Sequence, residues 1–100
     1  MTAPQLTISR HQQLTRGRYA ARLEGLDGEG ELAYSRTGKS LIIAEHTRVD
    51  DGLRGRGVAL ALVRRLVEDA RSEGVKIYAL CPYVSTERRR HPEWADVFQD

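Results

Sequence analysis

The stretch that decides the fold, residues 46–70, reads HTRVDDGLRGRGVALALVRRLVEDA. Its first half is a turn that contains three glycines and three arginines. In its second half, apolar residues recur every three or four positions, which is the pattern of one face of an amphipathic helix. Gly74 follows, at the place where a left-handed C-terminal residue is expected. The apolar face consists of Ala59, Leu62, Val63, Leu66, Val67 and Ala70.

Three segments before this helix have the character of strands joined by tight turns. The turns contain Asp27 followed by Gly28, and Gly38, which are residues that hairpins require. An antiparallel meander follows from this order. Residues 5–13 alternate only weakly, so residues 1–16 hold either a first strand or a loose N-terminal arm. The three segments are residues 18–25, 30–38 and 40–49.

A further strand is predicted after the helix. Residues 75–81 are rich in β-forming residues and end before Pro82, which has no backbone N–H. Strand, helix and strand form a right-handed crossover, so residues 41–49 and 75–81 are predicted to be parallel neighbours in one sheet. In the tail we expect a short helix with Ser85 as N-cap and a break near Pro92. A last turn returns Trp94, Val97 and Phe98 to the body.

The composition fits one α/β (α+β) domain over residues 1–100, with 40% hydrophobic and 30% charged residues. Lys and Arg number 16 against 14 Asp and Glu, and a net charge of +2 is far below that of proteins that coat nucleic acid. The longest apolar run, residues 58–63, is much shorter than the roughly 20 residues of a membrane span. The N-terminus lacks the pattern of a secretory signal. We expect a cytoplasmic protein without membrane or nucleic-acid partners.

Cys81 is the single cysteine of the chain. One cysteine can form no internal disulfide and no cysteine-rich zinc site, and we expect no metal site. Cys81 is therefore either part of the core or a reactive thiol.

The glycine-rich turn is suited to an anion. It joins a strand to the start of a helix, where backbone N–H groups lack internal partners and the helix dipole is positive. Glycines at 52, 55 and 57 allow close approach of a bulky phosphate, and Arg54 and Arg56 add positive charge. A phosphate or a pyrophosphate is the expected ligand.

Two well-known phosphate-binding loops do not fit this turn. A P-loop requires Lys followed by Ser or Thr at the helix start, where Val58 and Ala59 stand. A dinucleotide-binding crossover requires GxGxxG and an acidic residue at the end of the second strand. This turn reads GxxGxG, and that strand ends in Cys81.

The remaining pattern is Arg-x-x-Gly-x-Ala, which Arg54, Gly57 and Ala59 match. Together with CPYV at residues 81–84 and RHPEW at residues 90–94, it resembles the GNAT superfamily of acetyl-CoA-dependent N-acetyltransferases. More narrowly, the chain is similar to the short single-domain GNAT-like family with a cysteine in its active site. The resemblance covers about residues 17–98. It implies a mostly antiparallel sheet with a splayed parallel pair that flanks one main helix, followed by short C-terminal helices.

The resemblance also implies the site. Acetyl-CoA would be the co-substrate, with its pyrophosphate on the turn and its pantetheine arm between the splayed strands. A backbone N–H near residues 46–48 would contact the oxyanion. For Arg88, a solvated helix face is the alternative to contact with the coenzyme A phosphates. The implied cofactor-binding residues are Thr47, Arg48, Val49, Arg54, Gly55, Arg56, Gly57, Val58, Ala59 and Arg88.

Two routes would transfer the acetyl group to an amine acceptor. In direct attack, His46 acts as the base, because its reference pKa of about 6.5 suits proton transfer near neutral pH. In a relay, Cys81 carries the acetyl group transiently and His46 activates its thiol. Glu45 is expected to point to the opposite face from His46, and is less suited as a base. Tyr83 is left out of the catalytic set because an aromatic residue after a strand usually packs.

Two other functions are compatible with the same residues. The first is a non-catalytic coenzyme A-binding module. The second is a small nucleic-acid-binding domain that uses Arg54, Arg56 and residues 88–90 on phosphates, although the low net charge disfavours it. Short motifs do not identify the amine acceptor, which is a small molecule or a protein amine, and the protein is expected to be a monomer or a homodimer.

Overall fold

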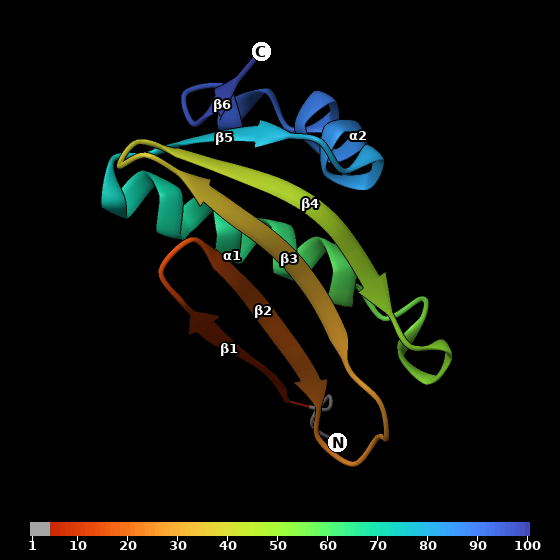
Figure 1. Ribbon diagram of the computed structural model, residues 1–100. Helices are drawn as coiled ribbons and strands as arrows, with labels where there is room; N and C mark the ends of the chain where they lie inside the picture. The colour runs from red at the N-terminus through yellow and green to blue at the C-terminus, as the bar shows by residue number, and fades with distance from the viewer. Residues whose placement is uncertain (1–4) are drawn as a thin grey trace.

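The computed structural model describes residues 5–100, and within that range there are six strands and two α-helices (Figure 1). The strands form one sheet in the order β1-β2-β3-β4-β5-β6. The first four are antiparallel neighbours, and β4, β5 and β6 are parallel. This confirms the predicted fold class. The elements are β1 (Leu6–Gln12), β2 (Arg16–Leu23), β3 (Gly30–Thr37), β4 (Leu41–Val49), α1 (Val58–Glu73), β5 (Lys76–Ala79), α2 (Pro82–Arg90) and β6 (Phe98–Gln99), with short 3-10 turns at Asp51–Leu53 and Pro92–Trp94.

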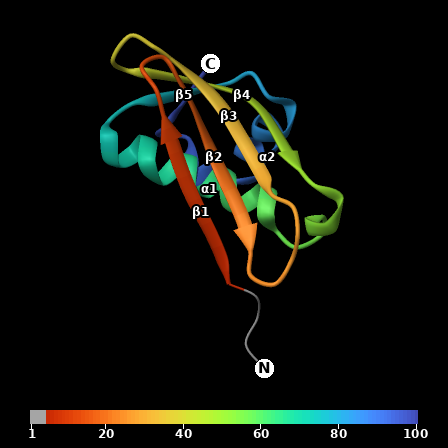
Figure 2. The same cartoon turned by 60° about the horizontal axis from the view of Figure 1, so that its bottom comes forward.

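Both helices cover the same face of the sheet. Helix α1 connects β4 to β5, and α2 connects β5 to β6. Each connection leads to the next strand on the same side along the sheet. Because such crossovers are right-handed, both helices lie on the same face. Figure 2 shows strands β1 to β4 in front of the helices, with no described element over the near side. We call the covered side the helix face and the other side the open face.

The core lies between the sheet and α1. Side chains that alternate along the strands point to the helix face, and the apolar stripe of α1 packs on them. Gly74 has φ +72° and its N–H donates to the carbonyls of Ala70 and Arg71, so it ends α1 as predicted. Fully buried members from both layers are Tyr19, Leu32, Tyr34, Ile42, Leu62, Val63, Leu66 and Ile77.

Three sequence-based expectations need correction or completion. The stretch before the meander is the strand β1, which pairs with β2 from Leu6 to Gln12. Helix α2 begins at Pro82 with Cys81 as N-cap, not at Ser85, because a proline in the first helical position needs no N–H acceptor. The tail adds the strand β6, whose two residues are too few for an alternating pattern. The three apolar residues of the tail are buried, as predicted: Trp94, Val97 and Phe98.

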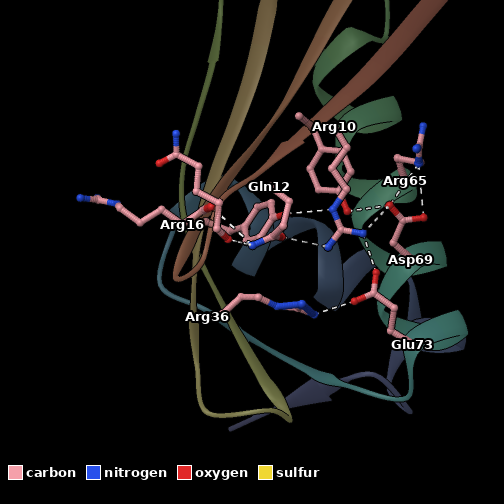
Figure 3. Close-up of polar contacts among 10 residues, drawn as sticks. Arg10, Gln12, Arg16, Arg36, Arg65, Asp69 and Glu73 are labelled. Atoms are coloured by element: carbon pink, nitrogen blue, oxygen red, sulfur yellow. Dashed lines mark hydrogen bonds and ion pairs between the residues drawn. The ribbon is translucent and has the colours of Figure 1, made fainter.

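A polar cluster fixes the edge strand β1 to α1 (Figure 3). The Arg10 guanidinium lies over the rings of Tyr19 and Tyr34 and reaches Asp69 at 3.4 Å and Glu73 at 2.5 Å. Its Nε donates to the Tyr34 hydroxyl at 2.8 Å, and the Tyr19 hydroxyl donates to Asp69 at 2.7 Å. Burial and the hydrogen bond to Asp69 raise the pKa of Tyr19, so its hydroxyl keeps the proton that it donates. The cluster therefore holds three strands and the helix together.

Replacement of Arg10 tests this cluster. Arg10→Ala is expected to lower the free energy of unfolding by about 2 kcal/mol, because partly buried acceptors lose a charged donor. Arg36→Ala is the control, since Arg36 shares the partner Glu73 at 2.6 Å but contacts neither tyrosine, and about 0.5 kcal/mol is expected. Urea denaturation measures both. Equal losses would show that the tyrosine contacts contribute nothing.

Candidate active site

A β-bulge in β4 determines which side chains meet at the site. Across β3 and β4, Ala33 pairs with His46 and Tyr34 pairs with Ala44, so Glu45 is an extra residue. Before the bulge, Ala44 faces the helices; after it, Thr47 does, opposite the buried Leu32. His46 consequently points to the open face.

The strands β4 and β5 part just beyond this bulge. Their pairing ends at Ala44 and Ala79, and the N–H groups of Leu80 and Cys81 both donate to the Ala44 carbonyl, at 3.1 and 2.9 Å. Beyond Ala44, none of the described residues pairs with this edge of β4. The parallel pair is therefore splayed at its carboxyl end, as the resemblance implied.

Cys81 and His46 come to the same end of the two strands, but their side chains do not meet. The Cys81 sulfur lies 3.5 Å from the Thr47 hydroxyl on the helix face. The His46 Nε2 lies 3.2 Å from a Glu31 oxygen on the open face. The expected contact between His46 and Cys81 is thus replaced by one between Thr47 and Cys81, because the bulge exchanges the faces of adjacent residues.

Cys81 occupies a defined position in the helix face. It is 4% exposed and is the N-cap of α2, where the helix dipole favours negative charge. Its burial resembles that of a packed core residue, while its position at a helix start resembles that of a reactive thiol. Both interpretations of Cys81 from the sequence therefore retain a physical basis.

Charged side chains surround His46 on the open face. Glu31 accepts hydrogen bonds from Arg18 at 2.6 Å and from His46. Partial burial raises the pKa of Glu31, but these hydrogen bonds and the charges of Arg18 and Arg48 outweigh that effect and hold the pKa below its usual range. Glu31 is therefore a carboxylate at neutral pH. The hydrogen bond from His46 Nε2 to Glu31 fixes the orientation of the imidazole ring.

Glu45 was expected on the face opposite to His46, and the structure corrects this. Its carboxylate lies 3.5 Å from the Arg16 guanidinium, and Arg16 lines a cavity of the open face together with Ala33. As the extra residue of the bulge, Glu45 does not follow the alternation of a regular strand. Both Glu45 and His46 thus reach the open face.

The glycine-rich turn lines a cavity of about 240 Å³ on the helix face. Gly55 and Gly57 have φ of +76° and +78°, the left-handed region that favours glycine. A Cβ at either position would meet nothing within 4 Å, so the cavity side of the turn is open. The lining contains predicted residues, namely Val49, Arg54, Gly55, Gly57, Val58 and Ala59, and also Leu53, Leu60 and Tyr83, which were not predicted.

The start of α1 gives this cavity a positive end. Gly57 is the N-cap, so no side chain caps the helix, and the first turn holds no acidic residue. Arg54 lies 3.2 Å from Asp51, and both side chains are largely exposed, so this weak pair can yield to a ligand. An anion at this helix start would meet backbone N–H groups that no side chain caps, and the exposed Arg54 guanidinium.

Some residues implied for the cofactor lie elsewhere. Thr47, Arg48 and Arg56 are not part of the cavity lining. Arg88 binds Asp100 at 2.9 Å and its guanidinium lies over the Phe98 ring, at 5.1 Å from its centre. These contacts hold the Arg88 side chain against the C-terminal segment. Its contact with the coenzyme A phosphates stays a prediction. Sequence alone could not choose between these partners.

Tyr83 is a site residue that the sequence reasoning set aside. It packs against the core and also lines the turn cavity. Burial, with the negative charge of Glu87, raises its pKa, so its hydroxyl is a proton-bearing donor at neutral pH. Its place two residues after Cys81, within CPYV at residues 81–84, was the signal in the sequence that could have identified it.

The comparisons with known proteins agree with this geometry. Residues 18–97 match the family model of the GCN5-related N-acetyltransferases. The chain belongs to this family. A GCN5-like protein from Staphylococcus aureus, solved by NMR, superposes with a TM-score of 0.65 at 26% identity, over 91% of this chain and 87% of the other.

The chain is also similar to curated proteins from animals. Protein NATD1 of Xenopus tropicalis is 28% identical over 89% of this chain and 82% of its own length. Protein NATD1 of Mus musculus is 30% identical over 77% of this chain and 70% of its own length. The protein is thus an acetyltransferase of GNAT type. Within residues 5–100, neither helix has the length and apolar character needed to cross a membrane.

Gly57→Glu tests the turn as the coenzyme A site. With coenzyme A at about ten times its Kd, the unaltered protein should gain about 1.4 kcal/mol, a rise in Tm of roughly 5–10 °C. Gly57→Glu should abolish this rise, because its carboxylate enters the anion site. Gly38→Glu is the matched control: Gly38 has φ +66°, open space around its Cβ position and no place in the cavity. A rise retained by Gly57→Glu would exclude this turn.

Proposed function

We propose that the protein transfers the acetyl group of acetyl-CoA to an amine, with the pyrophosphate on the turn before α1 and the pantetheine arm along β4. The observation that carries this proposal is the coincidence of two features. The free edge of β4 beyond Ala44 leads directly to the cavity under Gly57. A free strand edge pairs with an extended chain, and a helix start binds phosphate. The residues present therefore fit acetyl-CoA, which supplies an activated acetyl thioester when bound.

The proposed chemistry is direct attack from the open face. Glu31 accepts the N–H of His46 Nε2, which leaves the lone pair on Nδ1. The amine nitrogen attacks the thioester carbon, and Nδ1 accepts the amine proton. The carbon–sulfur bond then breaks. Tyr83 donates a hydrogen bond to the departing thiolate. The thiolate takes a proton from water, and the imidazolium returns the amine proton to the resulting hydroxide, so the base is regenerated.

The cysteine relay is the second route, and its geometry is different. Cys81 would attack the thioester from the helix face, with the Thr47 hydroxyl as its neighbour. His46 points to the other face, where its imidazole pairs with Glu31 rather than with the thiol. A relay would therefore proceed without activation by His46, which is why direct attack is preferred here.

Two substitutions separate these routes. His46→Gln should lower kcat by about 100-fold or more, because it removes the general base. Its effect on stability should be small, since the side chain is 59% exposed. Cys81→Ala should keep kcat within a few-fold of the unaltered protein. Intact-mass measurement after treatment with acetyl-CoA should show no acetyl group on Cys81. Loss of activity in Cys81→Ala, together with an acetylated Cys81, would establish the relay instead.

The role of Tyr83 gives a further prediction. Tyr83→Phe keeps the ring but removes the hydroxyl, and should lower kcat about tenfold by loss of one hydrogen bond to a charged atom. The Tm rise with coenzyme A should be preserved, because the cavity keeps its shape. A non-catalytic coenzyme A-binding module would show the same Tm rise but no acetyl product with any amine.

A further inference from the structure

A second cavity lies on the open face, distinct from the coenzyme cavity. It has a volume of about 260 Å³, and its lining includes His11, Arg16, Arg18, Glu31 and Ala33. These residues come from β1, β2 and β3 only, whereas the coenzyme cavity is formed by the end of β4, the turn, α1 and α2. The two cavities therefore belong to opposite faces of the sheet.

The open-face cavity lies beside His46. Arg18 pairs with Ala33 and Ala33 pairs with His46, so the three residues form one row across neighbouring strands. Strands in a sheet are about 4.8 Å apart, which places His46 one strand from the cavity floor at Ala33. Glu31 belongs to the lining and is also the hydrogen-bond partner of His46. A molecule in this cavity would thus lie next to the imidazole.

The cavity lining contains a carboxylate, Glu31, and a guanidinium, Arg16, that could each bind a different part of a ligand. The Glu31 carboxylate, on the side of His46, can accept from an ammonium or amine. Arg16 is 74% exposed and points away from the Arg10 cluster (Figure 3). Its one ion-pair partner among the described residues is Glu45, at 3.5 Å, which is too long for a strong hydrogen bond. The Arg16 guanidinium is therefore available for a carboxylate, which its fork of donors binds in a bidentate manner.

We propose that this cavity binds the acceptor, and that the acceptor is a small free amino acid whose carboxylate pairs with Arg16 while its amine lies between Glu31 and His46. The inference rests on the proposed function, because it assigns the amine of that reaction. The volume is below the range of drug-sized pockets and suits a molecule of a few heavy atoms. Binding between Arg16 and Glu31 would present the amine to His46 from the open face.

A matched pair of amines tests the assignment. β-Alanine and propylamine have chains of three carbons, and β-alanine has a carboxylate where propylamine has a methyl group. With acetyl-CoA as donor and product measured by mass spectrometry, the KM for β-alanine should be at least tenfold lower. Arg16→Gln should raise that KM about tenfold and leave the values for propylamine unchanged, because one charge-assisted contact is lost. Arg22→Gln, an exposed arginine of the same strand and face, should change neither.

Direct binding keeps this inference separate from the reaction. In an NMR titration of the protein with β-alanine, without coenzyme, the backbone amides of Arg18 and Ala33 should shift, and should shift less in Arg16→Gln. Shifts without any acetyl product would overturn the proposed function and keep the amino-acid site. Product formation with equal KM for both amines, or with no effect of Arg16→Gln, would overturn the amino-acid site and keep the function. Neither product nor shifts would overturn both.

Discussion

The extra residue Glu45 in β4 is the constraint on which the site depends. Without it, His46 and Thr47 would exchange faces, and Thr47 could not contact Cys81. A bulge also increases the local twist of its strand. The strands β4 and β5 also part at this place, because their pairing ends at Ala44. The bulge thus lies where the edge of β4 becomes free, and it determines which side chains near that edge point to each face.

A sheet covered on one side must keep its other side compatible with water. Here that is achieved mainly by charged pairs rather than by a second layer. Arg18 bridges Glu29 and Glu31, and Arg48 pairs with Glu29 and Asp50. Such partly exposed pairs contribute little to stability. Because they are weakly held, they also leave the open face able to exchange an internal partner for a ligand.

The sequence predicted what local periodicity and turn chemistry can encode. The stripe of α1, its end at Gly74 and the parallel placement of β4 and β5 all follow from spacing and from the hand of crossovers. The bulge did not follow, because its position is set by how β4 pairs with Ala33 and Tyr34, residues distant in sequence. The start of α2 was misplaced because Ser85 is a good N-cap in isolation, whereas Pro82 suits the first helical position better. The partner of Arg88 depended on where the tail docks.

The two faces have separate roles in the proposed arrangement. The coenzyme cavity uses the turn, the end of β4 and the helix starts, while the acceptor cavity uses β1, β2 and β3, with His46 beside it. Beyond Ala44 the strands β4 and β5 are parted. Through this opening, an amine on the open face could reach an acetyl group held on the helix face. Among the described residues, the two cavities have no lining residue in common. Substitutions at Arg16 can alter acceptor choice without a cost in coenzyme binding, whereas changes at Glu45 would disturb both, because the bulge orients the strand that the two cavities share.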